Sequence, residues 1–246
     1  MGDDRIHRFR RARRDPSLVV IEGFHALKHA LRFGADLEEA VAVDPEALER
    51  MAADLAPDLA GRFAGAVAAV DPDTLARMVP VAPPTGVVAI ARRPAFDLEA
   101  TLDDPRPAPV VLLERPRHMG NVGACVRVAA AADAAALLTT GEHDPWHPDA
   151  VRGGAGLQFA LPVGGVAAPA DFGRPLLAID PDGERLRPGT LPPRAVLAFG
   201  TERHGLSAEL LERAEARISI PMREGVSSLN LATSVAVTLF SWRLAS

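Results

Sequence analysis

Short apolar runs alternate with amphipathic stretches in the first 92 residues of the chain. Four apolar runs have the length and the β-branched content of strands, and they lie at 18–22, 39–43, 65–70 and 86–91. The stretches between them repeat their apolar residues three and four positions apart, as helices do, at 23–34, 45–56 and 72–79. This pattern predicts a small α/β unit.

The periodicity is lost at residues 93–107, which are charged and contain three prolines. This composition predicts a linker between two domains. Together with the pattern before it, it divides the chain into an N-terminal arm at 1–16, a small domain at 17–92, the linker, and a larger domain at 108–246.

A second α/β series begins after the linker. Its predicted strands lie at 109–114, 135–140, 176–180, 195–200 and 217–221, and its predicted helices follow Asn121, cover about 207–216, and run from about 228 to 244. Short apolar strands separated by helices indicate a parallel sheet that is covered on both faces.

Composition adds limits to this picture. No apolar run approaches the roughly 18 residues that span a membrane, and the first residues lack the apolar core of a secretory signal. Cys125 is the only cysteine, which excludes an intramolecular disulfide and a CxxC site. We therefore expect a cytoplasmic protein.

The formal net charge of −5 gives no global indication of nucleic-acid binding. However, residues 5–14 contain six arginines and no acid. Such an arm could follow a phosphate backbone, or it could be a solvated, disordered tail, and the sequence leaves both interpretations open.

Three loops are candidates for binding or catalysis, because parallel sheets bind ligands at the carboxyl ends of their strands. The first, at 116–134, carries Asn121 between two glycines, with Arg127 about one turn after Gly123. Taken alone, Arg127 is more simply an arginine whose stem covers apolar surface while its head group stays in water.

The second loop, at 198–206, has Glu202 directly after a strand, where it could orient an arginine or accept hydrogen bonds from a ligand. The third loop leads into the last helix, which Ser227 or Ser228 could cap. Capping does not require Asn230, which we expect on the first turn of that helix, and whose amide can both donate and accept.

Other polar clusters are weaker candidates. His25 and His29 have helical spacing but no evident third ligand, and residues 143–147 are more typical of a turn. Residues 153–159 match a dinucleotide-binding loop only loosely. We expect no metal site.

Together, in this order and spacing, the three loops resemble the SpoU (TrmH-type) family of the SPOUT methyltransferases. The first family motif corresponds to Asn121, Gly123 and Arg127, and the second to Phe199, Gly200, Glu202 and Gly205. The third corresponds to Ile220, Pro221, Met222, Ser228, Leu229 and Asn230. The resemblance covers about 107–246, and the small N-terminal domain resembles the family's ribosomal-protein-like substrate-binding domain more loosely.

This resemblance implies S-adenosylmethionine as methyl donor and a ribose 2′-hydroxyl of rRNA or tRNA as acceptor. It also implies a C-terminal SPOUT domain with a deep trefoil knot, and a homodimer with shared sites. The implied cofactor-binding residues are Phe199, Gly200, Thr201, Glu202, Ile220, Pro221, Met222, Ser228, Leu229 and Asn230. The implied catalytic residues are Asn121, Arg127, Glu202, Ser228 and Asn230.

Arg127 is the residue on which the implied chemistry depends. A guanidinium pKa lies near 13, so a neutral arginine at pH 7 would cost roughly 8 kcal/mol. Electrostatic stabilisation of a phosphate and a developing alkoxide is less costly, and the protonation state of Arg127 stays open. Two alternatives remain, an RNA-binding protein of this fold without catalysis and a SPOUT enzyme that methylates a base.

Overall fold

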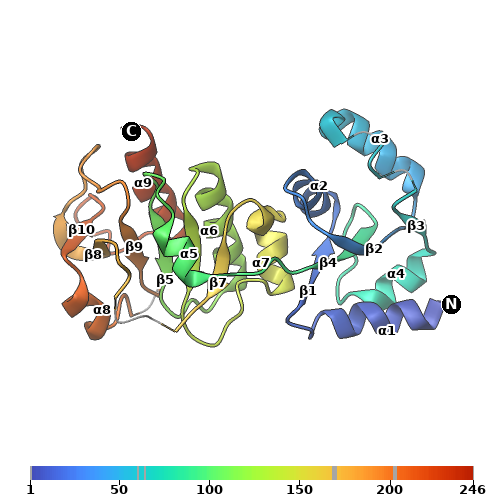
Figure 1. Cartoon of the computed structure of the whole chain (residues 1–246), viewed down its shortest axis with the longest axis horizontal. Coiled ribbons are helices and arrows are strands. Elements are labelled where there is room, and N and C mark those ends of the chain that lie inside the picture. Colours follow the sequence, from blue (N-terminus) through green and yellow to red (C-terminus); the bar gives the residue numbers. More distant parts are fainter. Residues whose placement is uncertain (1, 60, 64, 168–170, 202–203, 246) are drawn as a thin grey trace. The chain divides into compact units, whose positions relative to one another are not determined.

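The computed structural model describes residues 2–59, 61–63, 65–167, 171–201 and 204–245 (Figure 1). The chain forms two compact units. The first unit comprises residues up to 95 together with 146–160, and the second comprises 96–145 and 161 onward. Within the described residues, no helix is long and apolar enough to cross a bilayer.

The first unit is built on a four-stranded sheet in the order β1-β4-β2-β3. Its strands are β1 (Leu18–Glu22), β2 (Leu37–Ala42), β3 (Ala68–Ala69) and β4 (Val87–Arg92). After α1 (Gly2–Ala12), its helices are α2 (Phe24–Arg32), α3 (Pro45–Leu55), the 3-10 helix η1 (Pro57–Leu59) and α4 (Pro72–Met78). Asp44 and Asp71 begin α3 and α4 by accepting hydrogen bonds from backbone N–H groups of the first turn.

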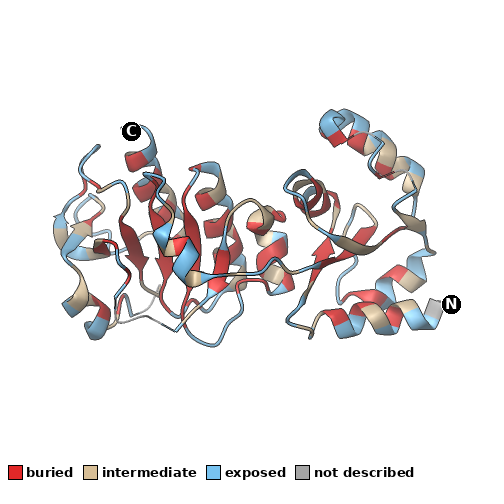
Figure 2. Cartoon of the chain, viewed as in Figure 1, coloured by how far each residue is buried: buried red, intermediate tan, exposed pale blue. Residues whose placement is uncertain are grey.

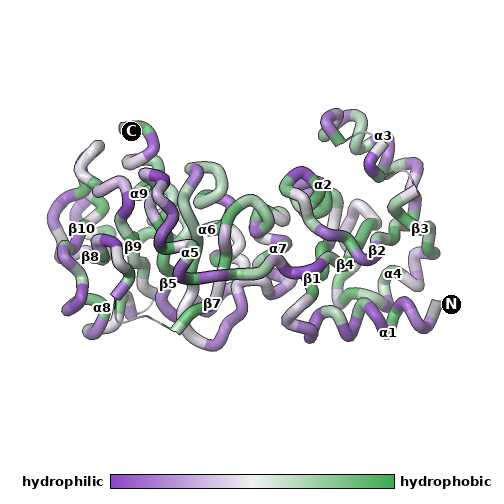
Figure 3. Tube along the Cα trace, viewed as in Figure 1, coloured by the Kyte–Doolittle hydropathy of each residue, from purple (hydrophilic) through white to green (hydrophobic). Residues whose placement is uncertain are grey.

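The N-terminal arm is not a disordered tail, because residues Gly2–Ala12 form helix α1. Its Ile6, Phe9 and Ala12 are buried and pack with Leu75 and Met78 in one apolar cluster. Figure 3 shows the hydrophobic positions alternating with hydrophilic ones along α1. The sequence did not predict this helix, because its apolar face has only three residues and charged residues, mainly arginines, occupy most of the other positions.

The second unit contains a six-stranded sheet in the order β10-β8-β9-β5-β6-β7, and all its strand pairs are parallel. The strands are β5 (Val110–Leu113), β6 (Ala136–Thr139), β7 (Val163–Gly165), β8 (Leu176–Arg185), β9 (Val196–Phe199) and β10 (Ala216–Ser219). The helices are α5 (Leu98–Asp103), α6 (Met119–Ala131), α8 (Ala208–Arg213) and α9 (Leu231–Arg243). The central strands are fully buried (Figure 2), so the prediction of a covered parallel sheet is confirmed.

Two segments differ from the expected pattern. Residues 93–107 contain α5, which Asp97 caps by accepting from the N–H of Ala100. Residues 146–160 lie within the second series in sequence but pack in the first unit, where they form α7 (Pro148–Gly153) and the 3-10 helix η2 (Leu157–Phe159). There Arg152 lies 2.7 Å from the buried carboxylate of Glu22, which also pairs with Arg13.

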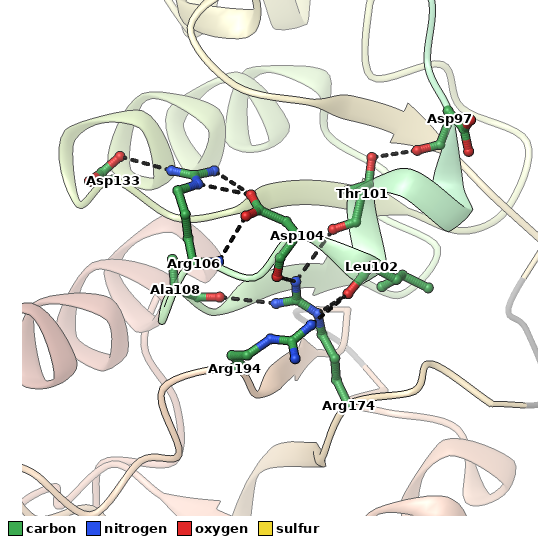
Figure 4. Close-up of polar contacts among 9 residues, drawn as sticks. All are labelled: Asp97, Thr101, Leu102, Asp104, Arg106, Ala108, Asp133, Arg174 and Arg194. Atoms are coloured by element: carbon green, nitrogen blue, oxygen red, sulfur yellow. Dashed lines mark hydrogen bonds and ion pairs between the residues drawn. The ribbon is translucent and has the colours of Figure 1, made fainter.

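A buried arginine fastens α5 to the second unit (Figure 4). The guanidinium of Arg174 donates to the carbonyls of Thr101, Leu102, Asp104 and Ala108, at 2.6–3.4 Å. Burial, with a smaller contribution from nearby Arg194, lowers the pKa of Arg174. These contacts lie where β5 and β8 begin, so they belong to the sheet edge away from the loops that carry the motifs.

Candidate functional site

A pocket of about 370 Å³ lies in the second unit, at the carboxyl ends of β9 and β10 and beside residues 179–181 in the middle of β8. Its walls come from β8, from the segments that follow β9 and β10, and from the first turn of α9, and they are lined by Ile179, Asp180, Pro181, Phe199, Gly200, Thr201, Gly205, Ile220, Met222, Ser227, Ser228, Leu229, Leu231 and Ser234. This volume falls in the usual range of roughly 300–1,000 Å³ for small-molecule sites. Apolar side chains with a few polar groups are also typical of such sites.

The pocket brings together most of the residues expected to bind a cofactor. Phe199, Gly200, Thr201, Ile220, Met222, Ser228 and Leu229 all line it. Pro221 and Asn230 are not among its lining residues, although both lie on its loops. Glu202 lies outside the described residues.

Gly200 is required by the local backbone. A Cβ atom there would lie 2.0 Å from the carbonyl carbon of Gly205, because the loop turns back on itself. Thr201 and Gly205 exchange backbone hydrogen bonds of 3.1 and 3.0 Å, and Gly205 has a positive φ of 64°. These two glycines therefore make possible a tight turn whose backbone faces the pocket.

Asp180, the only acid among the described lining residues, was not predicted from the sequence. Between Ala178 and Glu184 the pairing of β8 with β10 is interrupted, and the intervening residues carry Asp180 and Pro181 to the pocket. The backbone N–H of Asp182 donates to Asp180 Oδ1 at 2.9 Å, which fixes the carboxylate. The available signal was an acid in the Asp-Pro-Asp-Gly sequence after an apolar strand.

Glu114 was also missed, and it too directly follows a strand. Its buried carboxylate accepts a 2.7 Å hydrogen bond from the backbone N–H of Ser207. Ser207 begins α8 immediately after the Gly205 turn, and it caps this helix with its own hydroxyl. Glu114 therefore holds the end of the 199–206 loop against β5 and is a positioning residue.

Asn230, not Ser227 or Ser228, caps the last helix. Its Oδ1 accepts a 2.9 Å hydrogen bond from the N–H of Ala232, and α9 begins at Leu231. The predicted start near 228 is wrong, because the two serines are exposed in the preceding loop, where they line the pocket. The Nδ2 of Asn230 also contacts Oδ1 of Asn121 at 3.3 Å, so the first and third motifs meet.

Arg127 projects from the exposed side of α6. Its neighbours Val126 and Cys125 are buried, and α6 packs along α9. The guanidinium is thus accessible to a phosphate, in agreement with the expectation that its head group stays in water. None of the described pocket-lining residues comes from α6.

The structure gives the weaker histidine candidates other roles. His29 Nδ1 lies 2.7 Å from the carbonyl oxygen of Ala155. His147 begins α7 by accepting from the N–H of Asp149. Among the described residues, no group of three histidine, cysteine or carboxylate side chains is arranged to hold a metal ion.

A parallel sheet with a small-molecule pocket at its carboxyl edge defines the class, a ligand-binding α/β protein. Residues 108–240 match the SpoU rRNA Methylase family, and the chain belongs to this family.

Relatives with sequence similarity include an uncharacterised tRNA/rRNA methyltransferase of Mycobacterium bovis. It is 32% identical over 78% of this chain and 70% of its own length. A 23S rRNA (uridine(2479)-2′-O)-methyltransferase of Streptomyces viridochromogenes is 30% identical, over 64% of this chain and 59% of that enzyme. The crystal structure of an AdoMet-bound rRNA methyltransferase from Sinorhizobium meliloti is also similar. Its TM-score is 0.76 at 26% identity, with 97% of this chain and 92% of that one covered.

Proposed function

We propose that this chain transfers a methyl group from S-adenosylmethionine to a ribose 2′-hydroxyl of ribosomal or transfer RNA. The observation that carries the proposal is the convergence of the second and third family motifs on one pocket. The contact between Asn121 and Asn230 adds the first motif to the same assembly. Family membership supports the reaction, and the relatives that act on rRNA support the substrate class.

The pocket suits the proposed donor. Phe199, Ile220 and Leu229 offer apolar surface for a planar base, and Gly200 lines the pocket with backbone alone. Asp180 provides a carboxylate for a cationic or hydroxyl-bearing part of the donor. When bound, S-adenosylmethionine supplies an electrophilic methyl group on a sulfonium centre. Glu202 belongs to the proposed site by its motif position alone.

Arg127 would act on the acceptor. A ribose hydroxyl is a poor nucleophile at neutral pH, so its loss of a proton must be assisted and the alkoxide stabilised. A charged guanidinium on the exposed side of α6 can bind the adjacent phosphate and stabilise that negative charge. Asn121 and Asn230 would position the acceptor, and Ser228 would donate or accept a hydrogen bond at the pocket mouth.

We also propose a homodimer. The outward side of α9 exposes Val237 and Phe240, and Leu244 directly after the helix is exposed as well, so the three lie three and four positions apart. Apolar rows of this kind commonly mark protein–protein contacts. The inward side carries the fully buried Val235 and Leu239. Light scattering at micromolar concentration should give twice the chain mass, and a Phe240→Glu variant should give a monomer.

The proposal extends to a deep trefoil knot in the second unit. Its support is the way the 179–181, 199–205 and 220–229 segments line a single pocket. We also infer a cytoplasmic location from the proposed substrate, and fractionation of cells that produce the tagged chain would test it.

The direct test is methylation of total RNA with labelled S-adenosylmethionine, followed by mapping of the product. We expect label in one or a few positions that resist alkaline cleavage, since a 2′-O-methyl group blocks attack on the neighbouring linkage. Label on a base would favour the base-methyltransferase alternative. Donor binding without transfer to any RNA, including assembled ribosomal subunits, would favour a non-catalytic RNA-binding protein.

A further inference from the structure

The first unit contains a concave, strongly basic surface that the proposed function does not use. It is lined by the C-terminal half of α1, the end of α4 and the residues after α4. Five arginines and one histidine contribute, and none of its described lining residues is acidic. We name this surface the α1–α4 groove, and Arg10, Arg11, Arg14 and Arg77 are its most exposed cations.

The arginines of α1 divide into two groups. Arg5 and Arg8 face the sheet edge, where they form ion pairs of 2.8–3.1 Å with Glu38 and Glu39. Arg13 pairs with the buried Glu22. These pairs fasten the helix to its own domain, so their charges are already compensated.

The groove arginines are compensated much less. Arg10 donates to the backbone carbonyl of Arg77 at 2.9 Å, which is not an ion pair. Arg77 has one exposed partner, Asp3, at 3.0 Å. Arg11 helps to lower the pKa of Asp15, but the main contacts of that carboxylate are hydrogen bonds from Ser17. The groove therefore keeps a surplus of positive charge in a protein with a formal net charge of −5.

Compensation of the helix dipole alone does not account for this surplus of positive charge. One or two cations in the last turn compensate the partial negative charge at a helix C-terminus, with a gain of roughly 0.3–1 kcal/mol each. Here a third arginine follows the helix at position 14, and Arg77 of α4 faces the same concavity. Clustered like charges repel one another, so the arrangement is favourable when a polyanion occupies it.

We propose that the α1–α4 groove binds the phosphate backbone of the RNA substrate, outside the nucleotide that is methylated; this inference rests on the proposed function. Several guanidinium groups on one concave surface match successive phosphates of one strand. Phosphate contacts of this type position a nucleic acid without reading its sequence. The groove would thus contribute to affinity for RNA and leave the donor pocket unaffected.

A pair of variants tests the groove directly. Arg11→Gln with Arg14→Gln removes two exposed charges that form no ion pair or side-chain hydrogen bond within the described residues, so the fold should be retained. The matched control, Arg50→Gln with Arg92→Gln, removes the same charge from the same unit at two arginines whose side chains are 67% exposed. Circular dichroism should be unchanged in both, and thermal unfolding should be unchanged in the groove variant, whereas the control loses the exposed ion pairs of Arg92, worth about 1 kcal/mol or less each.

Filter binding of labelled, deproteinised ribosomal RNA at several KCl concentrations is the measurement. In the groove variant the affinity should fall about tenfold or more, and the slope of log K against log salt should decrease by roughly 1.4–1.8, for two lost phosphate contacts. The control should stay within about twofold of wild type. The KM for RNA should rise in the groove variant, while kcat at saturating RNA and the affinity for S-adenosylmethionine by calorimetry are retained.

Equal RNA affinity and equal salt slope in the groove variant and the control would overturn the inference, even if the wild-type chain methylates RNA. Conversely, the wild-type chain could bind RNA without methylating any. If the groove variant alone then lost RNA affinity, the result would support the groove and overturn the proposed function. Sedimentation with phosphatidylserine-containing vesicles tests whether the groove binds an anionic membrane surface instead. Vesicle binding that the groove variant loses, with RNA affinity retained, would assign the surface to a membrane.

Discussion

The Nδ2 of Asn230 donates a 3.3 Å hydrogen bond to Oδ1 of Asn121, across 109 positions of sequence. The Oδ1 of the same Asn230 accepts from the N–H of Ala232 and begins α9. One side chain therefore both begins a helix and connects it to α6. Asparagine is suited to this dual role, because its amide presents a donor and an acceptor in fixed geometry.

The first prediction separates these two roles. Asn230→Ser should retain most of the capping free energy, because serine is as good an N-cap as asparagine. It should lose the contact with Asn121 and lower methyl transfer by about tenfold, the scale of one hydrogen bond. Asn230→Ala should in addition lower the free energy of unfolding by about 1 kcal/mol. Equal activity in Asn230→Ser and wild type would mean that Asn230 is only a cap.

The second prediction concerns Gly200. A single methyl group there would overlap the backbone of Gly205, so Gly200→Ala must displace the turn that faces the pocket. We expect a loss of at least tenfold in S-adenosylmethionine affinity by calorimetry, with the fold retained. The control is Gly165→Ala in β7, where the nearest atom lies at an ordinary contact distance of 3.7 Å. Unchanged affinity in a folded Gly200→Ala variant would exclude this pocket as the donor site.

The sequence predicted which loops lie close together better than it predicted the boundaries of elements. Parallel strands end at a common edge, so polar and glycine residues after apolar strands were expected to meet, and Gly200, Met222 and Ser228 do line one pocket. The start of α9 was misjudged, because serine and asparagine cap equally well and only tertiary contacts select between them. Helix α1 was missed for a related reason, since its burial depends on Leu75 and Met78 far along the chain.

Long-range partners also explain the remaining differences. Residues 93–107 look like a linker because they are charged and rich in proline, but Arg174 binds four of the carbonyls at 101–108. Asp180 was not predicted as a pocket residue, because its position in the pocket depends on the interrupted pairing of β8 with β10. Neither contact has a signature within its own segment of sequence.

The third prediction tests the Arg174 contacts. Arg174→Ala should lower the free energy of unfolding by about 3 kcal/mol in a denaturant titration, since several buried carbonyls lose their donor. Arg174→Lys should recover little, because an ammonium group does not reproduce the fork of the guanidinium. Arg187→Ala, at an exposed arginine of the same unit, should change stability by no more than about 0.5 kcal/mol. A loss in Arg174→Ala no larger than in this control would mean that α5 is held by other contacts.

The last prediction concerns Arg127, on which the proposed chemistry depends. Arg127→Ala should fold with a stability within about 0.5 kcal/mol of wild type, because the residue lies on the exposed side of α6. It should bind S-adenosylmethionine normally, since the described pocket-lining residues come from other segments. Methyl transfer should fall by at least about 100-fold, the scale of one missing electrostatic or acid–base group.

Two comparisons make the Arg127 result specific. Arg127→Lys should restore little activity, because a lysine presents a point charge where a planar fork would bind a phosphate. Arg187→Ala should methylate RNA at the wild-type rate, which controls for the loss of one surface charge. Single-turnover rates at saturating RNA separate the chemical step from RNA binding, so a decrease that is confined to KM would assign Arg127 to binding alone. Near wild-type single-turnover rates in Arg127→Ala would make it a surface arginine, and the proposed activity would then rest on the pocket and on family membership without a role for Arg127.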